Sequence, residues 1–343
     1  MTAPFAMPDT SLRPSVRSLV RACAGAALLA CGPGIPKQKA DEWRADAGAW
    51  WLLRSPTQPA DMTDAAALVR TVVVDFVQTL APQSVAAKIF SRGLQLSFGQ
   101  AGQISVPTLL GDPSLASFVA EGWPIPVVQA LVEPLVTLVP RKLACIVVLT
   151  TEMVHSSNVE VLVFDALVRS AALALDSVLL DANPASSARP AGLRNGITAI
   201  AADASPEPLA ALVNDIGNLY AAVAATATRS PVYVMSASRA FSTRYLLPPG
   251  WAPADSLGSF ALHGTTDMLA IAPNAIASVY GNNVEISASR ESALQMETAP
   301  TDLSTGPTRS TWQTDCVAIR LKLPVTWALR TAGAVAWLTA TNW

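Results

Sequence analysis

The feature that most constrains the fold is a long apolar stretch, Ser156–Asp181, with the periodicity of one α-helix. Its apolar residues, from Val161 through Phe164 and Val168 to Leu179, recur at steps of three and four, which indicates an amphipathic helix. Ser157 and Glu160 are spaced as a capping box at its start, and the Asn-Pro pair at 183–184 would end it. At 1.5 Å per residue this helix would be about 35 Å long, roughly the width of a small domain.

The polar face of this predicted helix is thin, because further leucines and valines widen the apolar stripe. Its charged residues are Glu160, Asp165, Arg169 and Asp176, and the spacing of Asp165 and Arg169 predicts an ion pair across one turn. A helix this apolar is covered on most sides, either by its own domain or by neighbouring subunits. Taken alone, the stretch fits an ordinary core helix equally well.

The composition favours extensive contact with other chains. Of the 343 residues, 51% are hydrophobic and only 14% are charged, against about a quarter in a typical soluble protein. A membrane span would need about 18 apolar residues in a row. The longest uncharged stretches, within 93–112 and 268–284, are interrupted by Gln, Ser, Asn, Gly and Pro, so we expect no membrane span. An assembly with large subunit contacts is therefore the better explanation.

Charge and cysteine usage argue against several classes of protein. The net charge is −2, and the sequence has no basic domain of the kind that binds nucleic acid through its phosphates. Its four cysteines form no C-x-x-C pair and it has two histidines, so neither a zinc site nor a disulfide framework is indicated. A reducing compartment fits best.

An N-terminal segment, Arg17–Gly32, resembles a short secretory signal that ends in a lipoprotein-type Leu-Leu-Ala-Cys. However, its apolar run, Ala22–Ala30, is short and starts late in the chain. We therefore favour an alanine-rich helix of about Val16–Cys31 within an N-terminal arm, with a cell-envelope lipoprotein as the alternative.

The rest of the chain mixes helical and strand-like patterns, which predicts an α+β fold. Further helices are predicted at Thr63–Leu80, Ser84–Phe90, Glu207–Ala225 and Ser236–Leu246. Strands are predicted at Leu94–Phe98, Ile104–Val106, Phe118–Ala120, Val136–Leu149, Pro231–Met235, Met268–Ile271, Val284–Ser287 and within Asp315–Thr341. Glycines and prolines punctuate residues 91–150, so we expect a long hairpin-like excursion there. From Val317 to Leu323 apolar residues alternate with others, which predicts one buried and one wet face.

We find no constellation typical of an enzyme, a metal site or a cofactor site. His155 lies beside Glu152 and just before the predicted helix, and His263 has only Asp267 as a nearby carboxylate. G-x-S-x-G, H-E-x-x-H and phosphate-binding glycine-rich loops are missing from the sequence. The prediction is a protein without catalytic, cofactor-binding or metal-binding residues.

The order of these segments resembles the tailed-phage major capsid protein family, which has the Hong Kong 97-type fold. The resemblance is carried by Phe118–Pro126 (FVAEGWPIP), Pro140–Ala144 (PRKLA) followed by Leu149–Met153 (LTTEM), Ala270–Ala275 (AIAPNA), and Gln313–Arg320 (QTDCVAIR) with Trp327–Arg330 (WALR) and Gly333–Trp337 (GAVAW). These segments span roughly residues 60–343, and their order is more specific than any one of them.

The resemblance implies a role for each part of the chain. Residues 1–60 would be an N-terminal arm, 61–90 a helical segment leading to the loop, 91–148 the extended β-hairpin loop, 149–195 the peripheral domain with its long spine helix, 196–307 the axial domain, and 308–343 the C-terminal strands of the peripheral domain. The extended loop would lie over an adjacent subunit, and the axial domain would meet its copies around five-fold and six-fold axes.

The resemblance also implies a function. The chain would be the major capsid protein of a tailed phage or prophage, assembling through pentamers and hexamers into an icosahedral shell around double-stranded DNA. Its partners would be copies of itself, separate scaffolding, portal and decoration proteins, and DNA without sequence-specific contacts. It would act in the virion, after assembly in the host bacterial cytoplasm. A nanocompartment for protein cargo, a gene-transfer particle of the same fold, and a cell-envelope lipoprotein or hydrolase remain as alternatives.

Six residues are candidates for subunit contacts. Phe118, Glu121 and Trp123 belong to the predicted extended loop, and Arg141 lies where the chain returns from it. Glu285 and Arg290, with Glu291 beside them, form a small charge cluster that would pair between subunits or simply face solvent.

Two features depart from the family's pattern. Many relatives carry a long N-terminal scaffolding segment that a protease removes, whereas this chain begins with a short arm, so we expect scaffolding to be separate or absent. One relative crosslinks its subunits through a loop lysine. The five lysines here, Lys37, Lys39, Lys88, Lys142 and Lys322, lie away from the predicted loop tip at 118–131, so we expect no isopeptide crosslinks.

Overall fold

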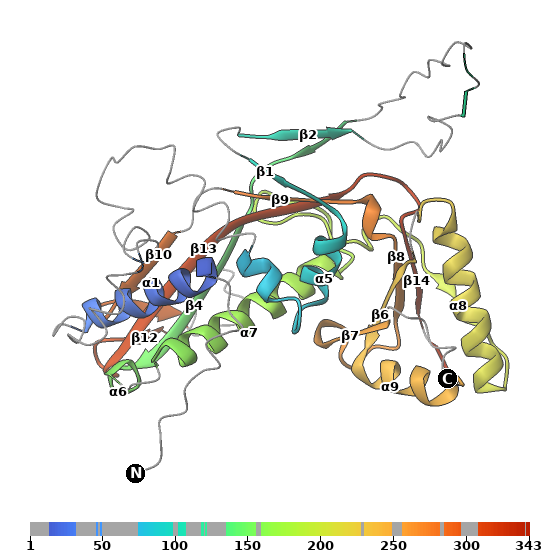
Figure 1. Ribbon diagram of the computed structural model, residues 1–343. Helices are drawn as coiled ribbons and strands as arrows, with labels where there is room; N and C mark the ends of the chain where they lie inside the picture. Colours follow the sequence, from blue (N-terminus) through green and yellow to red (C-terminus); the bar gives the residue numbers. More distant parts are fainter. Residues whose placement is uncertain are drawn as a thin grey trace. The chain divides into compact units, whose positions relative to one another are not determined.

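A computed structural model describes residues 14–31, 46, 49, 75–98, 102–107, 118–119, 121, 135–155, 159–227, 230–248, 256–281, 285–295, 308–339 and 341–343. The chain forms two compact units. Unit 1 comprises 1–83, 142–172 and 281–324, and unit 2 comprises 84–141, 173–280 and 325–343. Helices and strands are mixed in both, so the predicted α+β class is confirmed (Figure 1). Among the described residues, none of the helices is both long and apolar enough to cross a membrane.

The long apolar stretch forms helix α7 (Val159–Leu179), preceded by the short α6 (Thr151–His155). Ser157, half of the predicted capping box, lies outside the described residues. Arg169 pairs with Asp165 at 3.2 Å, as their spacing predicted. The apolar stripe is only partly as predicted. Val168, Ala172, Leu175 and Leu179 are buried, whereas Val161 is 37% exposed, because the buried face is centred on the row that contains Val159, Val163 and Leu167.

Unit 1 is built on a sheet in which the first part of β13 (Cys316–Leu329) lies between β10 (Glu285–Ser289) and β4 (Lys142–Thr150), antiparallel to both. The predicted alternation is confirmed for Val317, Ile319, Leu321 and Leu323, all of which are buried. Arg320 is exposed and Lys322 is half-buried, whereas Ala318, expected on the wet face, is buried. The same unit contains a small antiparallel pair of strands, β11 (Ala293–Gln295) and β12 (Thr308–Ser310).

Helix α1 (Pro14–Ala30) packs on this sheet against β10 (Figure 1). It confirms the predicted N-terminal helix. Leu28 and Cys31, from the lipoprotein-type motif, are 1% and 5% exposed. In this fold the segment therefore belongs to the core of unit 1, because its apolar residues are buried against the sheet.

Unit 2 begins with α5 (Val85–Arg92), which has Ser84 as its N-cap. Strand β1 (Leu94–Ser97) follows and pairs in parallel with β9 (Ile276–Tyr280), and β9 pairs with the last residues of β13. Beside them, β2 (Ile104–Pro107) and β3 (Leu135–Leu138) form an antiparallel hairpin. Short 3₁₀ turns occupy Phe260–Leu262 and Pro273–Ala275.

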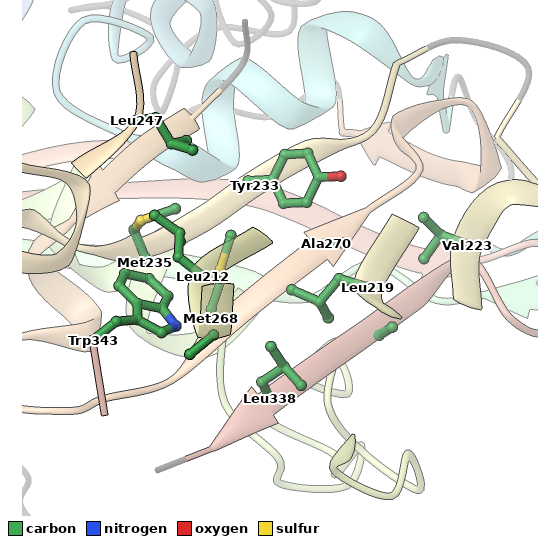
Figure 2. Close-up of a cluster of buried hydrophobic side chains, with 12 residues drawn as sticks. Leu212, Leu219, Val223, Tyr233, Met235, Leu247, Met268, Ala270, Leu338 and Trp343 are labelled. Atoms are coloured by element: carbon green, nitrogen blue, oxygen red, sulfur yellow. The ribbon is translucent and has the colours of Figure 1, made fainter. Parts of the chain in front are cut away.

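The second sheet of unit 2 has the order β5-β14-β8-β6-β7. Its strands are β5 (Ile200–Ala201), β14 (Val335–Thr339), β8 (Met268–Ile271), β6 (Val232–Ser236) and β7 (Ser256–Ser259). Helices α8 (Pro208–Ala224) and α9 (Ala237–Leu246) pack on it. Figure 2 shows their shared core, to which α8 contributes Leu212 and Leu219, while β6, β8 and β14 contribute Met235, Met268 and Leu338.

The structure corrects several expectations. Residues 308–343 were grouped in one domain, but β14 pairs with β8 and β5 in the second sheet of unit 2. The predicted extended loop, 91–148, is shorter than expected. Strand β1 at its start pairs with β9, and β4 at its end pairs with β13, so both strands belong to sheets rather than to the loop. The long strand predicted at Val136–Leu149 is broken between β3 and β4, where Pro140 lies. Phe118 and Val119 are not in a strand, and β5, β7, β9, β11 and β12 were not predicted. Most of the helix predicted at Thr63–Leu80 lies outside the described residues.

The Asp176 carboxylate organises one end of unit 2. It is 4% exposed and accepts hydrogen bonds from the Ser84 hydroxyl (2.6 Å), the backbone N–H groups of Val85 (3.1 Å) and Ala86 (2.9 Å), and the Ser259 hydroxyl (3.2 Å). A buried carboxylate is tolerated only when such donors satisfy it. Here it caps the N-terminus of α5, where a negative charge is also favoured by the helix dipole. Asp176 thereby ties α7, α5 and β7 together.

Replacing Asp176 by Ala should lower the free energy of unfolding by about 3 kcal/mol, because several buried donors lose their partner. Urea unfolding of the unassembled subunit, followed by tryptophan fluorescence, measures this. Asp165→Ala, on the exposed side of the same helix, is the control and should change the stability by less than about 0.5 kcal/mol. Equal effects of the two substitutions would contradict the role given to Asp176.

Candidate subunit-interface surfaces

The β2–β3 hairpin is anchored at its base, and the residues that the structure describes between its strands are exposed. Val106 and Leu138 are buried in a cluster with Phe98, Ala277 and Val279. Of the residues between the two strands, the structure describes Phe118, Val119 and Glu121, and all three are exposed, Phe118 completely. Covering an exposed phenylalanine side chain is favourable by about 1.5–3 kcal/mol. The predicted contact residues Phe118 and Glu121 are thus available to a neighbour, while Trp123 lies outside the described residues.

Arg141, the fourth predicted contact residue, lies at the base of the hairpin and is held within the chain. Its guanidinium donates a hydrogen bond to the backbone carbonyl of Ser187, and its own carbonyl accepts one from the N–H of Val325 at 2.8 Å. Its half-buried side chain still borders an open groove.

This groove has a volume of about 360 Å³ and lies between β3, the segment 185–195 and the end of β13. Arg141 is the charged residue of its lining, which otherwise includes apolar residues such as Val136, Pro190 and Trp327. The Trp327 indole donates to the Ala191 carbonyl at 3.0 Å and lies 5.5 Å from the Phe90 ring, so its position is fixed.

The segment beside the groove is folded tightly. A Cβ atom added to Gly192 would lie 2.2 Å from the backbone oxygen of Asp181, so only glycine fits there. Arg189 donates to the Asp181 carboxylate at 2.6 Å and holds the same turn. The groove wall is therefore preformed.

The open face of the unit 1 sheet combines paired charges with exposed aliphatic side chains. Lys322 donates to Glu285 at 2.6 Å, and Arg320 donates to the Ser287 hydroxyl at 3.0 Å. The hydrogen bond from Lys322 lowers the pKa of Glu285, with smaller contributions from the charges of nearby cations. On the same face Ile146 is 52% exposed. The charged pair could form the polar rim of a subunit contact and the aliphatic side chains its centre, as is common in interfaces.

Arg290 is not paired with Glu285, although the two were predicted as one cluster. It donates to the Cys31 carbonyl at 3.0 Å and to the Asp315 carboxylate at 2.8 Å. The Thr151 hydroxyl also donates to Asp315 at 2.9 Å. Arg290 therefore joins the end of α1 to the start of β13 within unit 1, and its contact with another subunit stays a prediction.

Sequence reasoning missed the outer faces of α8 and α9. Helix α8 carries one charged residue, Asp215, which is fully buried and accepts from the Trp343 indole at 2.8 Å. The exposed face of α8 is consequently free of charge. On α9, Phe241 and Tyr245 are 72% and 81% exposed and their rings stack. The scarcity of charge in 208–224, where Asp215 is the one charged residue, was a usable signal in the sequence.

The described residues offer no site for metal chemistry, since no group of three His, Cys, Asp or Glu side chains gathers among them. All four cysteines carry free thiols. Burial raises the pKa of Cys145 to about 11 and also raises that of Cys23, so both thiols are protonated at neutral pH. Such thiols are poor nucleophiles and poor metal ligands.

Comparison with known proteins relates the chain to a phage capsid protein. The sequence is 30% identical over 299 residues to the capsid polyprotein of Pseudomonas phage PAJU2, covering 80% of this chain and 44% of the relative. The chain thus spans less than half the length of that relative. No known protein-family model matches the sequence.

Solved structures from phages and virus-like particles are similar at a lower level. The satellite phage P4 procapsid that includes the size determination (Sid) protein has a TM-score of 0.49 and 10% identity, covering 77% of this chain and 97% of its own. For Microbacterium phage Oxtober96 the TM-score is 0.49 with 16% identity, covering 75% and 91%. For the virus-like particle from Pyrococcus furiosus it is 0.47 with 10% identity, covering 79% and 97%. All three TM-scores lie below 0.5.

Lys322→Met should raise the pKa of Glu285 toward that of a free glutamate, because the main cause of its depression is removed. An NMR titration of the Glu285 carboxyl in the unassembled subunit measures it. Lys142→Met, which removes only a more distant charge, is the control and should have a smaller effect. Since the folded pKa is lowered, the pair stabilises the fold above the pKa of the unfolded carboxyl. This contribution is lost as the pH falls through the folded pKa. An unchanged Glu285 pKa in Lys322→Met would show that the pair does not form in solution.

Proposed function

We propose that the chain is the major capsid protein of a tailed phage or prophage, with the Hong Kong 97-type fold. It assembles through pentamers and hexamers into an icosahedral shell around double-stranded DNA. The observation that carries the proposal is the 30% identity to a phage capsid polyprotein across four fifths of this chain.

The described elements fit the parts of such a subunit. The β2–β3 hairpin corresponds to the base of the extended loop. Helix α7 and the sheet of β4, β10 and β13 correspond to the peripheral domain, and the sheet that carries α8 and α9 corresponds to the axial domain. Strand β14 then joins the axial rather than the peripheral domain.

The exposed apolar side chains support assembly. They lie on several separate elements: Phe118 in the loop, Ile146 on β4, Tyr220 on α8, Phe241 on α9 and Trp312 before β13. On α8 and α9 they are grouped, as Leu209, Val213 and Tyr220 and as Phe241 and Tyr245. Large contiguous apolar patches are uncommon on monomeric proteins. Heterologous contacts, in which different surfaces of two copies meet, cover such patches and generate rings.

The role is structural rather than enzymatic. The protein acts in the virion after assembly in the bacterial cytoplasm, with separate scaffolding, portal and decoration proteins as partners. Its net charge of −2 suits a shell that encloses DNA without reading its sequence.

The chain, expressed in bacteria with the neighbouring phage structural genes, should elute from size exclusion far above its 35.8 kDa mass. The particles should protect DNA from added nuclease. Particles that hold protein but no DNA would favour a nanocompartment, and a monomer under all these conditions would contradict the proposal. A denaturing gel should show one band near 35.8 kDa, since we expect no isopeptide crosslinks.

Glu121→Ala should impair assembly more than folding, because Glu121 is exposed and its predicted role is contact with a neighbour. The yield of particles by sedimentation should fall several-fold, while the urea midpoint of the unassembled subunit stays unchanged. Glu152→Ala, another exposed carboxylate, is the control. Normal shells formed by the Glu121 variant would refute this contact.

A further inference from the structure

Helices α8 and α9 lie side by side on the same face of the unit 2 sheet. Both turn their inner sides to one cluster, to which α8 contributes Leu212 (Figure 2) and against which Ala240 of α9 packs, partly buried. Helix α8 packs over β14 and β8, and α9 packs over β6 and β7. Because the strand order is β14-β8-β6-β7, the two helices occupy opposite edges of a two-helix layer. Each leaves one face uncovered.

The uncovered face of α8 is apolar and ends in negative charge. Leu209, Val213 and Tyr220 are 44%, 46% and 53% exposed, and their spacing of four and seven puts them on one side of the helix. Glu207, the N-cap residue, is exposed and makes no capping hydrogen bond with its side chain. Asp203, close before it, has a pKa lowered by hydrogen bonds from Ser205 and Asn214, so this end of the helix is acidic.

Gly217 lies in the middle of this face, between Val213 and Tyr220. Glycine inside a helix costs about 1 kcal/mol relative to alanine. Nothing in the described chain requires it, since an added Cβ would meet no atom within 4 Å. Its effect is a depression between two large side chains on the surface of the helix.

The uncovered face of α9 is aromatic and positive. Phe241 and Tyr245 stack with 6.3 Å between ring centroids and 15° between planes, and both are largely exposed. Helix α9 contains two arginines and no acidic residue. Arg239 is engaged by the Thr341 carbonyl and the Trp343 ring, whereas Arg244 is exposed between the two stacked aromatics in sequence. Aromatic residues and arginine are the types that contribute most to protein contacts.

We propose that the α9 face of one copy (Phe241, Arg244, Tyr245) docks on the α8 face of the next copy (Leu209, Val213, Gly217, Tyr220), with Arg244 beside Glu207. The charges decide in favour of this pairing. Two α9 faces would bring arginines together, and two α8 faces would bring carboxylates together, whereas α9 on α8 matches opposite charges. Each copy carries both faces at opposite edges, so the contact can repeat head to tail, which is the kind of contact that builds a ring. This inference rests on the proposed function and names the side chains through which axial regions meet.

A charge swap tests the pairing. Arg244→Glu and Glu207→Arg, each alone, should reduce the assembled fraction in sedimentation velocity by about tenfold, because like charges then face each other. The double variant should recover assembly. Circular dichroism and urea unfolding of the unassembled variants confirm that each still folds.

A larger side chain at Gly217 tests the role of the depression on α8 without altering charge. Gly217→Leu should fold normally, since its side chain has open space, and should block assembly. Ala222→Leu adds similar volume at an exposed position on another side of α8 and is the control.

If the wild-type chain forms shells and either Arg244→Glu or Gly217→Leu assembles normally, this contact is overturned and the proposed function stays intact. Failure of the folded double variant to recover assembly would also overturn it. A wild-type chain that never assembles would overturn the proposed function and this contact together.

Discussion

A chain that is 51% hydrophobic and 14% charged has more apolar surface than its own cores hold. The structure shows which of these apolar side chains are buried and which are exposed. The helix α7, the strand β13 and the helix α1 are well buried, yet large apolar side chains remain exposed on the loop, on β4 and on the outer faces of α8 and α9. Because burying such side chains is the main favourable term in association, these exposed surfaces support the proposed contacts with copies of the same chain.

Two buried carboxylates, Asp176 and Asp215, hold parts of unit 2 in place through hydrogen bonds. Asp176 caps α5 and holds β7, and Asp215 holds the C-terminal Trp343 and the N–H of Asp203. Both are carboxylates that accept hydrogen bonds from several donors. Both carboxylates therefore fix the positions of the elements around them.

Much of the fold follows from local pattern, and the rest from pairings that local pattern does not encode. Helices α7, α8 and α9 and strand β8 lie where their periodicity predicted them, within a few residues. The partner of β14 was missed, because alternation tells which face of a strand is buried but not which strand lies beside it. Strand β9 was missed because a strand buried on both faces shows no alternation.

For the candidate contact residues, too, local sequence predicted exposure but not the partners of each side chain. The exposure of Phe118 and Glu121 agrees with their predicted place in a loop, since loops run on the surface. Glu285 and Arg290 are close in sequence but bind Lys322 and Asp315, because sheet register brings distant residues opposite each other. The faces of α8 and α9 depend on which side of each helix packs on the sheet, and only the fold determines that.

The central claim is that this subunit closes into rings and then into a shell. Cryo-electron microscopy of particles purified after expression with the neighbouring structural genes tests it most directly. An icosahedral reconstruction, with the α8–α9 layer of each subunit around the five-fold and six-fold axes, is the predicted result. Particles of another architecture, or only monomers under these conditions, would contradict the account.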